Sequence, residues 1–227
     1  MPYLIENYEH IVWDFNGTLL DDLTPGYEAT NLLLARRALP MLPDAEAYRR
    51  VFDFPIRNCY IRLGFDFERE SYEKVAAEWT AEYERLLDSP RLRPGAAELL
   101  RRIGEVGIPQ SVISACEEGR LRRQIGLLGI AGYFRGIYGR NDIYADDKTG
   151  IARRFTQTQR PGRTLMIGDT DHDFACASAA GFDCVLLCGG FQEEERLRAC
   201  GCPVVQGFEE LAVADRRDRK ETICHGI

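Results

Sequence analysis

From residue 94 onward, short apolar segments alternate with amphipathic helical segments. A helix that opens at Pro94 precedes the strand-like run 110–114, and the same order then repeats. Further strands are expected near 136–138 and at 164–167, 184–187 and 203–205, with helices near 117–128, from 148, and near 171–180, 192–199 and 207–213. Strands that alternate with crossover helices form a parallel sheet with helices on both faces. The sequence therefore predicts an α/β fold with a Rossmann-like parallel sheet core, to which the apolar run 11–13 adds a strand.

The alternation is interrupted between residues 21 and 88. Helical segments follow one another there, near 24–37, 44–52, 55–63 and 68–87, with no buried strand between them. The chain returns through the proline-rich stretch 89–95, which is typical of a hinge. We therefore expect a core domain formed by residues 1–20 and 89–227, and a small all-helical cap domain formed by residues 21–88.

The composition excludes several classes of protein. The chain has 227 residues, a net charge of −7 and a pI near 5.2, so we expect no nucleic-acid partner. No apolar run reaches the length of a bilayer, which argues against a membrane partner. The first residues lack the pattern of a secretory signal, and the eight cysteines show no paired metal-ligand spacing. We therefore expect a cytoplasmic protein without a zinc site.

Polar residues stand where the predicted strands end. Asp14, Ser114 and Asp169 follow three of these strands, and Lys148 begins a helix. The carboxyl ends of parallel strands form the ligand-binding edge of such sheets. An attacking carboxylate, a hydroxyl, an ammonium and a second acidic group suit phosphoryl transfer, and Asp169 with Asp173 offers hard oxygen ligands for Mg²⁺. Asp169 and Asp173 also suit the N-cap and first turn of the helix near 171–180, which does not exclude a metal role.

Taken in order, these motifs resemble the haloacid dehalogenase-like (HAD) superfamily, most closely its phosphoglycolate-phosphatase-like branch with a helical cap inserted after the first motif. The matching stretches are Asp14-Phe15-Asn16-Gly17-Thr18, Ser114 after Val112-Ile113, Lys148, and Gly168-Asp169-Thr170 with Asp173. The resemblance implies a Mg²⁺-dependent phosphatase of small phosphate monoesters, with an aspartyl-phosphate on Asp14 as intermediate. The expected partner is a small phosphorylated metabolite, and the expected state is a monomer or weak homodimer.

The resemblance also implies a role for each site residue. Catalytic roles fall to Asp14, Asn16 and Lys148. Phosphate contacts fall to Thr18, Ser114, Ala115 and Lys148. The Mg²⁺ ligands are Asp14, Asp169, Asp173 and the main-chain carbonyl of Asn16. In the predicted cap, Arg57, Asn58 and Arg62 are candidates for substrate specificity, although solvated charges on a helix face are the favoured explanation for them.

Asn16 departs from the phosphatase pattern. In the family, the residue two positions after the nucleophile is normally a second aspartate, which protonates the leaving oxygen and then activates water. An asparagine cannot transfer that proton, and general acid–base catalysis is typically worth about 10² to 10⁴ in rate. The main-chain carbonyl of Asn16 is unaffected by the change, so metal and phosphate binding are expected to survive.

Several accounts of Asn16 stay open at this point. The enzyme acts on esters with good leaving groups, or it recruits Asp21, Asp22 or His172 as the proton carrier. Alternatively, it is a weakly active or non-hydrolysing phosphate- or metabolite-binding regulatory protein. Two further accounts are open. In one, Asn16 is an engineered substitution that traps a substrate complex; in the other, Asn16 deamidates at the Asn16-Gly17 bond and restores an aspartate.

Overall fold

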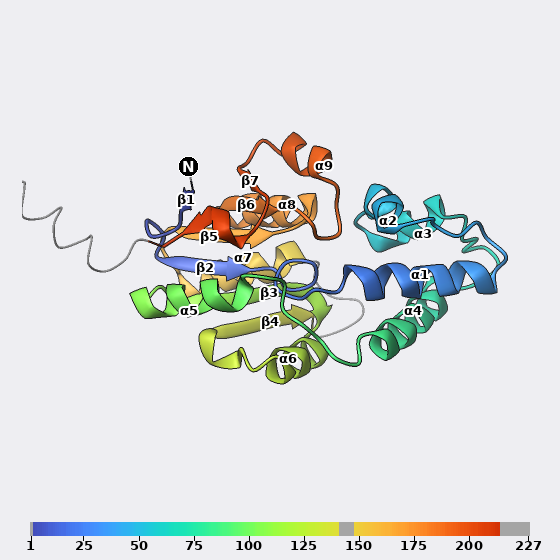
Figure 1. Cartoon of the computed structure of the whole chain (residues 1–227), viewed down its shortest axis with the longest axis horizontal. Helices are drawn as coiled ribbons and strands as arrows, with labels where there is room; N and C mark the ends of the chain where they lie inside the picture. Colours follow the sequence, from blue (N-terminus) through green and yellow to red (C-terminus); the bar gives the residue numbers. More distant parts are fainter. Residues whose placement is uncertain (1, 141–147, 214–227) are drawn as a thin grey trace, which may run out of the picture.

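The computed structural model describes residues 2–140 and 148–213 and confirms the predicted α/β fold (Figure 1). Its main sheet has the strand order β4-β3-β2-β5-β6-β7, and every neighbouring pair in it is parallel. The strands are β2 (His10–Trp13), β3 (Gln110–Glu117), β4 (Gly136–Arg140), β5 (Thr164–Gly168), β6 (Asp183–Leu187) and β7 (Val204–Val205).

Helices cover both faces of this sheet. They are α5 (Ala96–Val106), α6 (Glu118–Leu127), α7 (Lys148–Gln159), α8 (Asp171–Ala180) and α9 (Glu194–Ala199). Successive strand residues point to opposite faces. Trp13 therefore packs with Leu100 of α5 and Leu121 of α6 in one buried cluster. Val12 packs on the other face with Phe155 of α7, and residues of α8 join the same cluster.

Four helices fill the segment between β2 and α5. They are α1 (Leu23–Arg36), α2 (Ala45–Val51), α3 (Ile56–Arg62) and α4 (Tyr72–Leu86), and they lie together at one end of the molecule (Figure 1). They enclose a small core of their own around Leu33, Tyr60 and Val75. The two chain crossings to this segment are hydrogen-bonded to each other, since the N–H of Arg93 donates to the carbonyl of Leu19 (2.9 Å). The division into two domains stays a prediction.

One predicted helix is wrong. Residues 207–213 contain a 3-10 turn (Phe208–Glu210) and strand β8 (Leu211–Ala212) instead. Strand β8 pairs in parallel with β1 (Tyr3–Leu4), with Tyr3 opposite Leu211. The pairing buries Leu211 and Val213 against the main core. A two-residue strand held by the opposite end of the described chain has no local periodicity from which to predict it.

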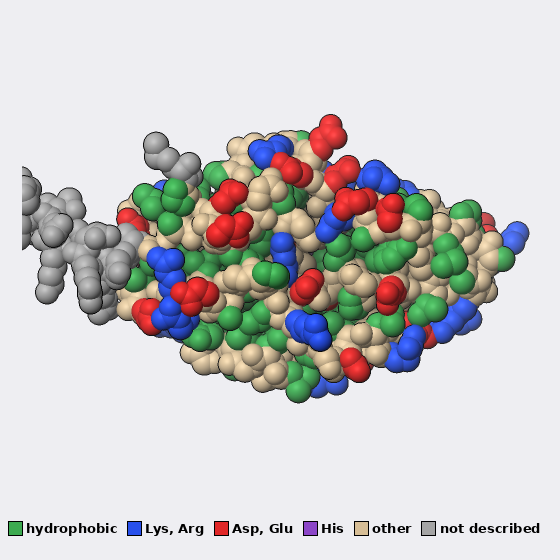
Figure 2. All heavy atoms as spheres, viewed as in Figure 1, with side chains coloured by type: hydrophobic (Ala, Val, Ile, Leu, Met, Phe, Trp, Pro, Cys, Tyr) green, Lys and Arg blue, Asp and Glu red, His purple; other side chains and the backbone are tan. Residues whose placement is uncertain are grey.

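Within the described ranges, no helix is both long and apolar enough to cross a membrane. Figure 2 shows acidic and basic side chains interspersed on one face of the molecule. Some surface charges pair within a single helix, as Arg101 does with Glu98 in α5 (2.7 Å). The charge on the face in view is therefore locally mixed, although the chain as a whole carries −7.

Candidate active site

The order of the strands changes direction at β2. Strands β3 and β4 extend the sheet on one side of β2, and β5, β6 and β7 extend it on the other. Ligands of such sheets bind in the crevice beyond the carboxyl ends of the strands at this switch point. Asp14 directly follows β2, and Asp169 directly follows β5. The topology therefore brings two predicted site carboxylates to one crevice.

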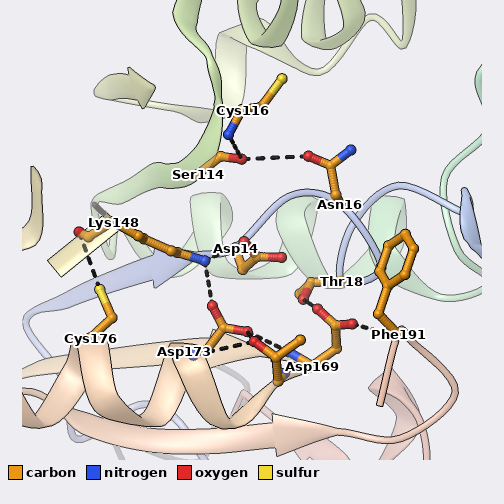
Figure 3. Close-up of polar contacts among 12 residues, drawn as sticks. Asp14, Asn16, Thr18, Ser114, Cys116, Lys148, Asp169, Asp173, Cys176 and Phe191 are labelled. Atoms are coloured by element: carbon orange, nitrogen blue, oxygen red, sulfur yellow. Dashed lines mark hydrogen bonds and ion pairs between the residues drawn. The ribbon is translucent and has the colours of Figure 1, made fainter. Parts of the chain in front are cut away.

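Asp14 is buried at this edge of the sheet. Its N–H donates to the carbonyl of Ile167 (2.9 Å), which continues the pairing of β2 with β5 by one residue. Lys148, the first residue of α7, donates from its ammonium to the carboxylates of Asp14 and Asp173 (Figure 3). All three side chains are buried. The Lys148 ammonium thus forms ion pairs with both carboxylates, and all three groups are shielded from water.

Asp169 is held by the loop that follows Asp14. The hydroxyl of Thr18 donates to Asp169 Oδ1 (2.9 Å), and the N–H of Phe191 donates to Oδ2 (2.6 Å). Gly17 has a φ of +76°, and a Cβ at this position would lie 2.4 Å from Asp169 Oδ2. Only glycine allows this approach. Because the Thr18 hydroxyl is used by Asp169, its contact with a phosphoryl oxygen stays a prediction.

Asp173 lies in the first turn of α8. The N-cap is Thr170, one residue after the position expected for Asp169, and it forms a capping box with Asp173. Asp173 Oδ2 accepts hydrogen bonds from the N–H groups of Asp169 (3.0 Å) and Thr170 (2.9 Å) and from the Thr170 hydroxyl (2.7 Å). Its Oδ1 faces Lys148. The start of α8 therefore fixes the orientation of this carboxylate.

Burial dominates the electrostatics of the site. It raises the pKa of Asp14 to about 6, against the attraction of Lys148. Burial, together with the charges of Asp14 and Asp173, raises the pKa of Asp169 well above its usual range. Asp173 is also buried, but Lys148 and the hydrogen bonds from Lys148 and Thr170 hold its pKa below the usual range. Three carboxylates and one ammonium leave an excess of negative charge in this crevice.

This excess suits a divalent cation. Asp14, Asp169 and Asp173 each offer a carboxylate oxygen, and these oxygens lie within 4.8 Å of one another. Mg²⁺ prefers hard oxygen ligands, whereas zinc prefers imidazole and thiolate. The donor set therefore fits Mg²⁺, the metal that the sequence predicts.

Ser114 lies next to Asn16. It belongs to β3, and its Oγ accepts a hydrogen bond from the N–H of Cys116 (3.1 Å) and donates to Asn16 Oδ1 (3.5 Å) (Figure 3). Ala115 follows it in β3 and is half-buried. The pairing of β2 with β3 brings these residues to the same edge as Asp14. Their contacts with phosphate stay predictions.

The carboxamide of Asn16 is held by a buried carboxylate. Its Nδ2 donates to Asp22 Oδ2 (2.8 Å) and to the Tyr83 hydroxyl (3.1 Å). Asp22 also accepts from the N–H of Gly17 (2.7 Å) and from the Tyr83 hydroxyl (2.6 Å). Burial raises the pKa of Asp22 to about 6, although these hydrogen bonds lower it. Sequence reasoning missed Tyr83, because nothing in the helical pattern of α4 distinguishes it.

A family profile described as haloacid dehalogenase-like hydrolase matches residues 11–187, well over half of the chain. The chain belongs to the haloacid dehalogenase-like hydrolases.

Two curated proteins illustrate what this haloacid dehalogenase-like hydrolase is similar to. A phosphoglycolate phosphatase from Pseudomonas fluorescens is 25% identical, over 91% of this chain and 76% of that protein. A 5'-nucleotidase from Pseudomonas aeruginosa is 27% identical, over 85% of this chain and 88% of that protein. Among solved structures, a haloacid dehalogenase-like hydrolase from Streptococcus pneumoniae has a TM-score of 0.75 at 19% identity and covers 94% of this chain and 97% of its own. The family and the fold therefore agree with the resemblance of the motifs.

Three side chains are candidates to replace the acid that this haloacid dehalogenase-like hydrolase lacks at position 16. Asp21 is exposed, whereas Asp22 is buried in the network that holds Asn16. The ring of His172 stacks on Phe54 (4.4 Å between centroids) at the contact between the helical segment and α8. The structure therefore separates the three, since Asp22 alone among them is hydrogen-bonded to Asn16.

The helical segment contacts the core beside the crevice. Phe52, which follows α2, stacks on Phe191 (4.7 Å between centroids). Arg49 of α2 donates to the carbonyl of Gly190 (2.8 Å). Arg196 of α9 pairs with Asp53 (2.6 Å). These contacts join the helical segment to the loop whose backbone holds Asp169 and to α9.

The predicted specificity residues have partners within the helical segment. The guanidinium of Arg57 lies over the ring of Phe67 (5.3 Å), and Arg62 pairs with Asp53 (2.6 Å). Asn58 is exposed. A role in substrate binding stays a prediction for these three residues.

Proposed function

We propose that this protein is a Mg²⁺-dependent phosphatase of small phosphate monoesters that forms an aspartyl-phosphate on Asp14. The observation that carries the proposal is the cluster of Asp14, Asp169, Asp173 and Lys148, all buried at one edge of the sheet. The relatives named phosphoglycolate phosphatase and 5'-nucleotidase support a reaction on phosphate esters. Because these two names differ in substrate, they support the shared reaction rather than one particular compound.

The carboxylates of Asp14, Asp169 and Asp173 would hold Mg²⁺, with the main-chain carbonyl of Asn16 as a further oxygen ligand. When bound, Mg²⁺ supplies positive charge that lets one anion approach another. Lys148 contributes a second positive charge, because its ammonium donates a hydrogen bond to the Asp14 carboxylate. The excess of carboxylates over cations in this crevice supports this division of roles.

The reaction places an attacking oxygen and a leaving oxygen on opposite sides of phosphorus. A carboxylate oxygen of Asp14 attacks, and the ester bond to the leaving group breaks. Water then attacks the phosphorus of the aspartyl-phosphate and releases inorganic phosphate. Ser114, Ala115, Thr18 and Lys148 bind the phosphoryl oxygens in both steps.

Helices α1 to α4 serve as a cap over this crevice in our proposal. Residues 21–88 then form the cap domain, and residues 1–20 and 89–227 form the core domain. Two observations support the division. The helices have their own apolar core, and the two crossings lie side by side, with Leu20 bridged to Leu92. A cap of this kind excludes water and selects the substrate.

The proposal is tested with the purified chain and a panel of phosphate esters, in the presence of Mg²⁺ or of a chelator. We expect turnover that requires Mg²⁺, and we expect Asp14→Asn to abolish it together with phosphorylation of the protein. Full activity of Asp14→Asn would show that another residue is the nucleophile. Absence of wild-type turnover together with a large gain in Asn16→Asp would favour a non-hydrolysing phosphate-binding protein.

A further inference from the structure

The hydrogen bonds of Asn16 fix its orientation. Its amide nitrogen donates to Asp22 (2.8 Å) and to the oxygen of Tyr83 (3.1 Å), while the Tyr83 hydroxyl gives its own proton to Asp22 (2.6 Å). An ionised carboxylate only accepts hydrogen bonds, so turning the amide over would set its oxygen against Asp22. Asn16 therefore presents Oδ1 towards Ser114 and the crevice (Figure 3).

In this orientation Asn16 offers a hydrogen-bond acceptor, Oδ1, towards the crevice, and no hydrogen-bond donor. The amide hydrogens are used by Asp22 and Tyr83, and an amide has no proton to release at neutral pH. Asp22 is 1% exposed and accepts hydrogen bonds from Asn16, Gly17 and Tyr83. Asn16 also lies between Asp22 and Ser114, because it bonds to both. Neither Asn16 nor Asp22 is therefore placed to protonate a leaving oxygen.

We infer that the substrates of this site are activated phosphates, in which the leaving oxygen departs as a stable anion without receiving a proton. Acyl phosphates, phosphoanhydrides and phosphate esters of acidic hydroxyls form this class, whereas simple alkyl phosphates do not. The inference rests on the proposed function, and it narrows the substrate class of the same site.

The two steps balance without an acid at position 16. In the first step, an Asp14 oxygen forms a bond to phosphorus, the bond to the leaving oxygen breaks, and the electron pair stays on that oxygen. In the second step, the oxygen of water bonds to phosphorus and the bond from Asp14 to phosphorus breaks, which regenerates the carboxylate. One proton of water stays on the oxygen that joins phosphorus and the other passes to a phosphate oxygen, so the product is dihydrogen phosphate. Asn16 Oδ1 accepts a hydrogen bond from this water and orients it.

Asp22 and Tyr83 are positioning residues in this scheme, since they act through Asn16. Tyr83 is itself held in place, because its ring stacks on Trp79 (4.8 Å between centroids). The Trp79 Nε1–H donates in turn to the Thr30 hydroxyl of α1 (3.0 Å). Helices α1 and α4 thus decide which atom of Asn16 faces the substrate.

The direct test is the dependence of kcat/KM on the acidity of the leaving group. The wild-type chain is assayed with Mg²⁺ on aryl phosphates of graded phenol acidity, on acetyl phosphate and on an alkyl phosphate. We expect a steep dependence, with the alkyl phosphate slower than acetyl phosphate by about 10² to 10⁴, the usual value of general acid catalysis. In Asn16→Asp we expect a flatter dependence, because alkyl phosphates gain most of that factor while acetyl phosphate gains little.

Two single variants test other sources of the proton. Asp21→Asn removes an exposed acid next to Asp22, and His172→Gln removes the imidazole at the start of α8. We expect both variants to keep the wild-type slope. A steeper slope in either variant would identify that side chain as the proton donor and would overturn the inference.

Asp22→Asn and Tyr83→Phe test the positioning role. We expect both variants to lower kcat and KM together, so that kcat/KM and its slope across the series stay unchanged. Because the second step is slowed, phosphorylated Asp14 should accumulate at steady state, which a loss of stability alone would not produce. A slope that steepens in Asp22→Asn would make Asp22 the acid and contradict the inference.

The wild-type measurement also separates this inference from the proposed function. If alkyl phosphates are hydrolysed as fast as aryl phosphates, the inference fails and the phosphatase stands. If no compound turns over and acetyl phosphate does not phosphorylate Asp14, the proposed function itself fails.

Discussion

His10 lies buried between the sheet and α7. Its Nε2 is 3.0 Å from the hydroxyl of Ser111 in β3, and its ring packs edge-on against Phe155 (5.3 Å between centroids). Burial, assisted by the charge of Arg135, lowers the pKa of His10 to about 4. An unfolded chain protonates a histidine near its ordinary pKa of about 6.5. The folded protein therefore keeps a neutral His10 over a range of pH in which the unfolded chain gains a proton.

This difference predicts a loss of stability in acid. The contribution of His10 is fully present above about pH 6.5 and is lost as the pH falls towards 4, by about 3 kcal/mol of unfolding free energy. His10→Gln retains a polar partner for Ser111 and cannot titrate, so its unfolding free energy should change less between neutral and acidic pH. Urea unfolding of both proteins across this range measures the difference. An equal dependence on pH in both would contradict a neutral buried imidazole.

Arg196 connects three elements. It lies in α9, and its guanidinium pairs with Asp53 after α2 (2.6 Å) and with Asp171 in the first turn of α8 (2.7 Å). It also donates to the carbonyl of Phe52 (3.0 Å). A fork of donors that is shared between two carboxylates and a carbonyl constrains geometry more strongly than an exposed ion pair. Arg196 therefore links the helical segment to α8 and α9 of the core.

Arg196→Gln should remove the ion pairs with Asp53 and Asp171. We expect residues 45–62 to exchange their amide hydrogens faster, by a factor that corresponds to about 1–3 kcal/mol of local opening, with little change in the exchange of the sheet. Arg198→Gln is the matched control, because Arg198 lies in the same helix and, among the residues described, forms an ion pair only with the half-exposed Glu194. Equal exchange in wild type and Arg196→Gln would show that other contacts hold the segment.

At the scale of the whole molecule, the carboxylate cluster that we propose to bind Mg²⁺ exists only in the assembled fold. Asp14 follows β2, Asp169 follows β5 and Asp173 belongs to α8, so their oxygens meet only when the sheet and α8 are assembled. A ligand that binds the folded state alone stabilises it in proportion to the logarithm of its concentration. The negative charge that burial concentrates here therefore costs the protein stability, and a bound cation would relieve that cost.

Mg²⁺ should raise the melting temperature, and at a hundredfold excess over its Kd it should add about 2.7 kcal/mol to the unfolding free energy. In Asp169→Asn this gain should largely disappear, because the amide offers one oxygen ligand fewer and no negative charge. Thermal melts with chelator, with Mg²⁺ and with NaCl of equal ionic strength distinguish binding from screening. Asp183→Asn, a half-exposed acid paired with Arg163, is the control that should keep the gain. A wild-type melting temperature unaffected by Mg²⁺ would argue against the metal site.

Local pattern was sufficient for most elements, because buried strands and amphipathic helices carry their periodicity within about ten residues. The strand before Asp14 and the helix from Lys148 are where the sequence predicts them. The small sheet of β1 and β8 was missed, since its two strands of two residues exist only through their pairing with each other. For the same reason the sequence predicts Asp22 as a candidate proton carrier but does not predict Tyr83, which reaches Asn16 from the far end of α4.

The sequence by itself determined the α/β fold, the family motifs and the chemical types of the site residues, because strand-end carboxylates and a lysine at a helix start are local features. Only the tertiary structure decided what Asn16 presents to the crevice. Its orientation depends on Asp22 five residues beyond Gly17 and on Tyr83 in another helix, which long-range packing brings into hydrogen-bonding distance. The orientation of Asn16, the unusual residue of the first motif, is therefore set by contacts with residues that lie outside the motif.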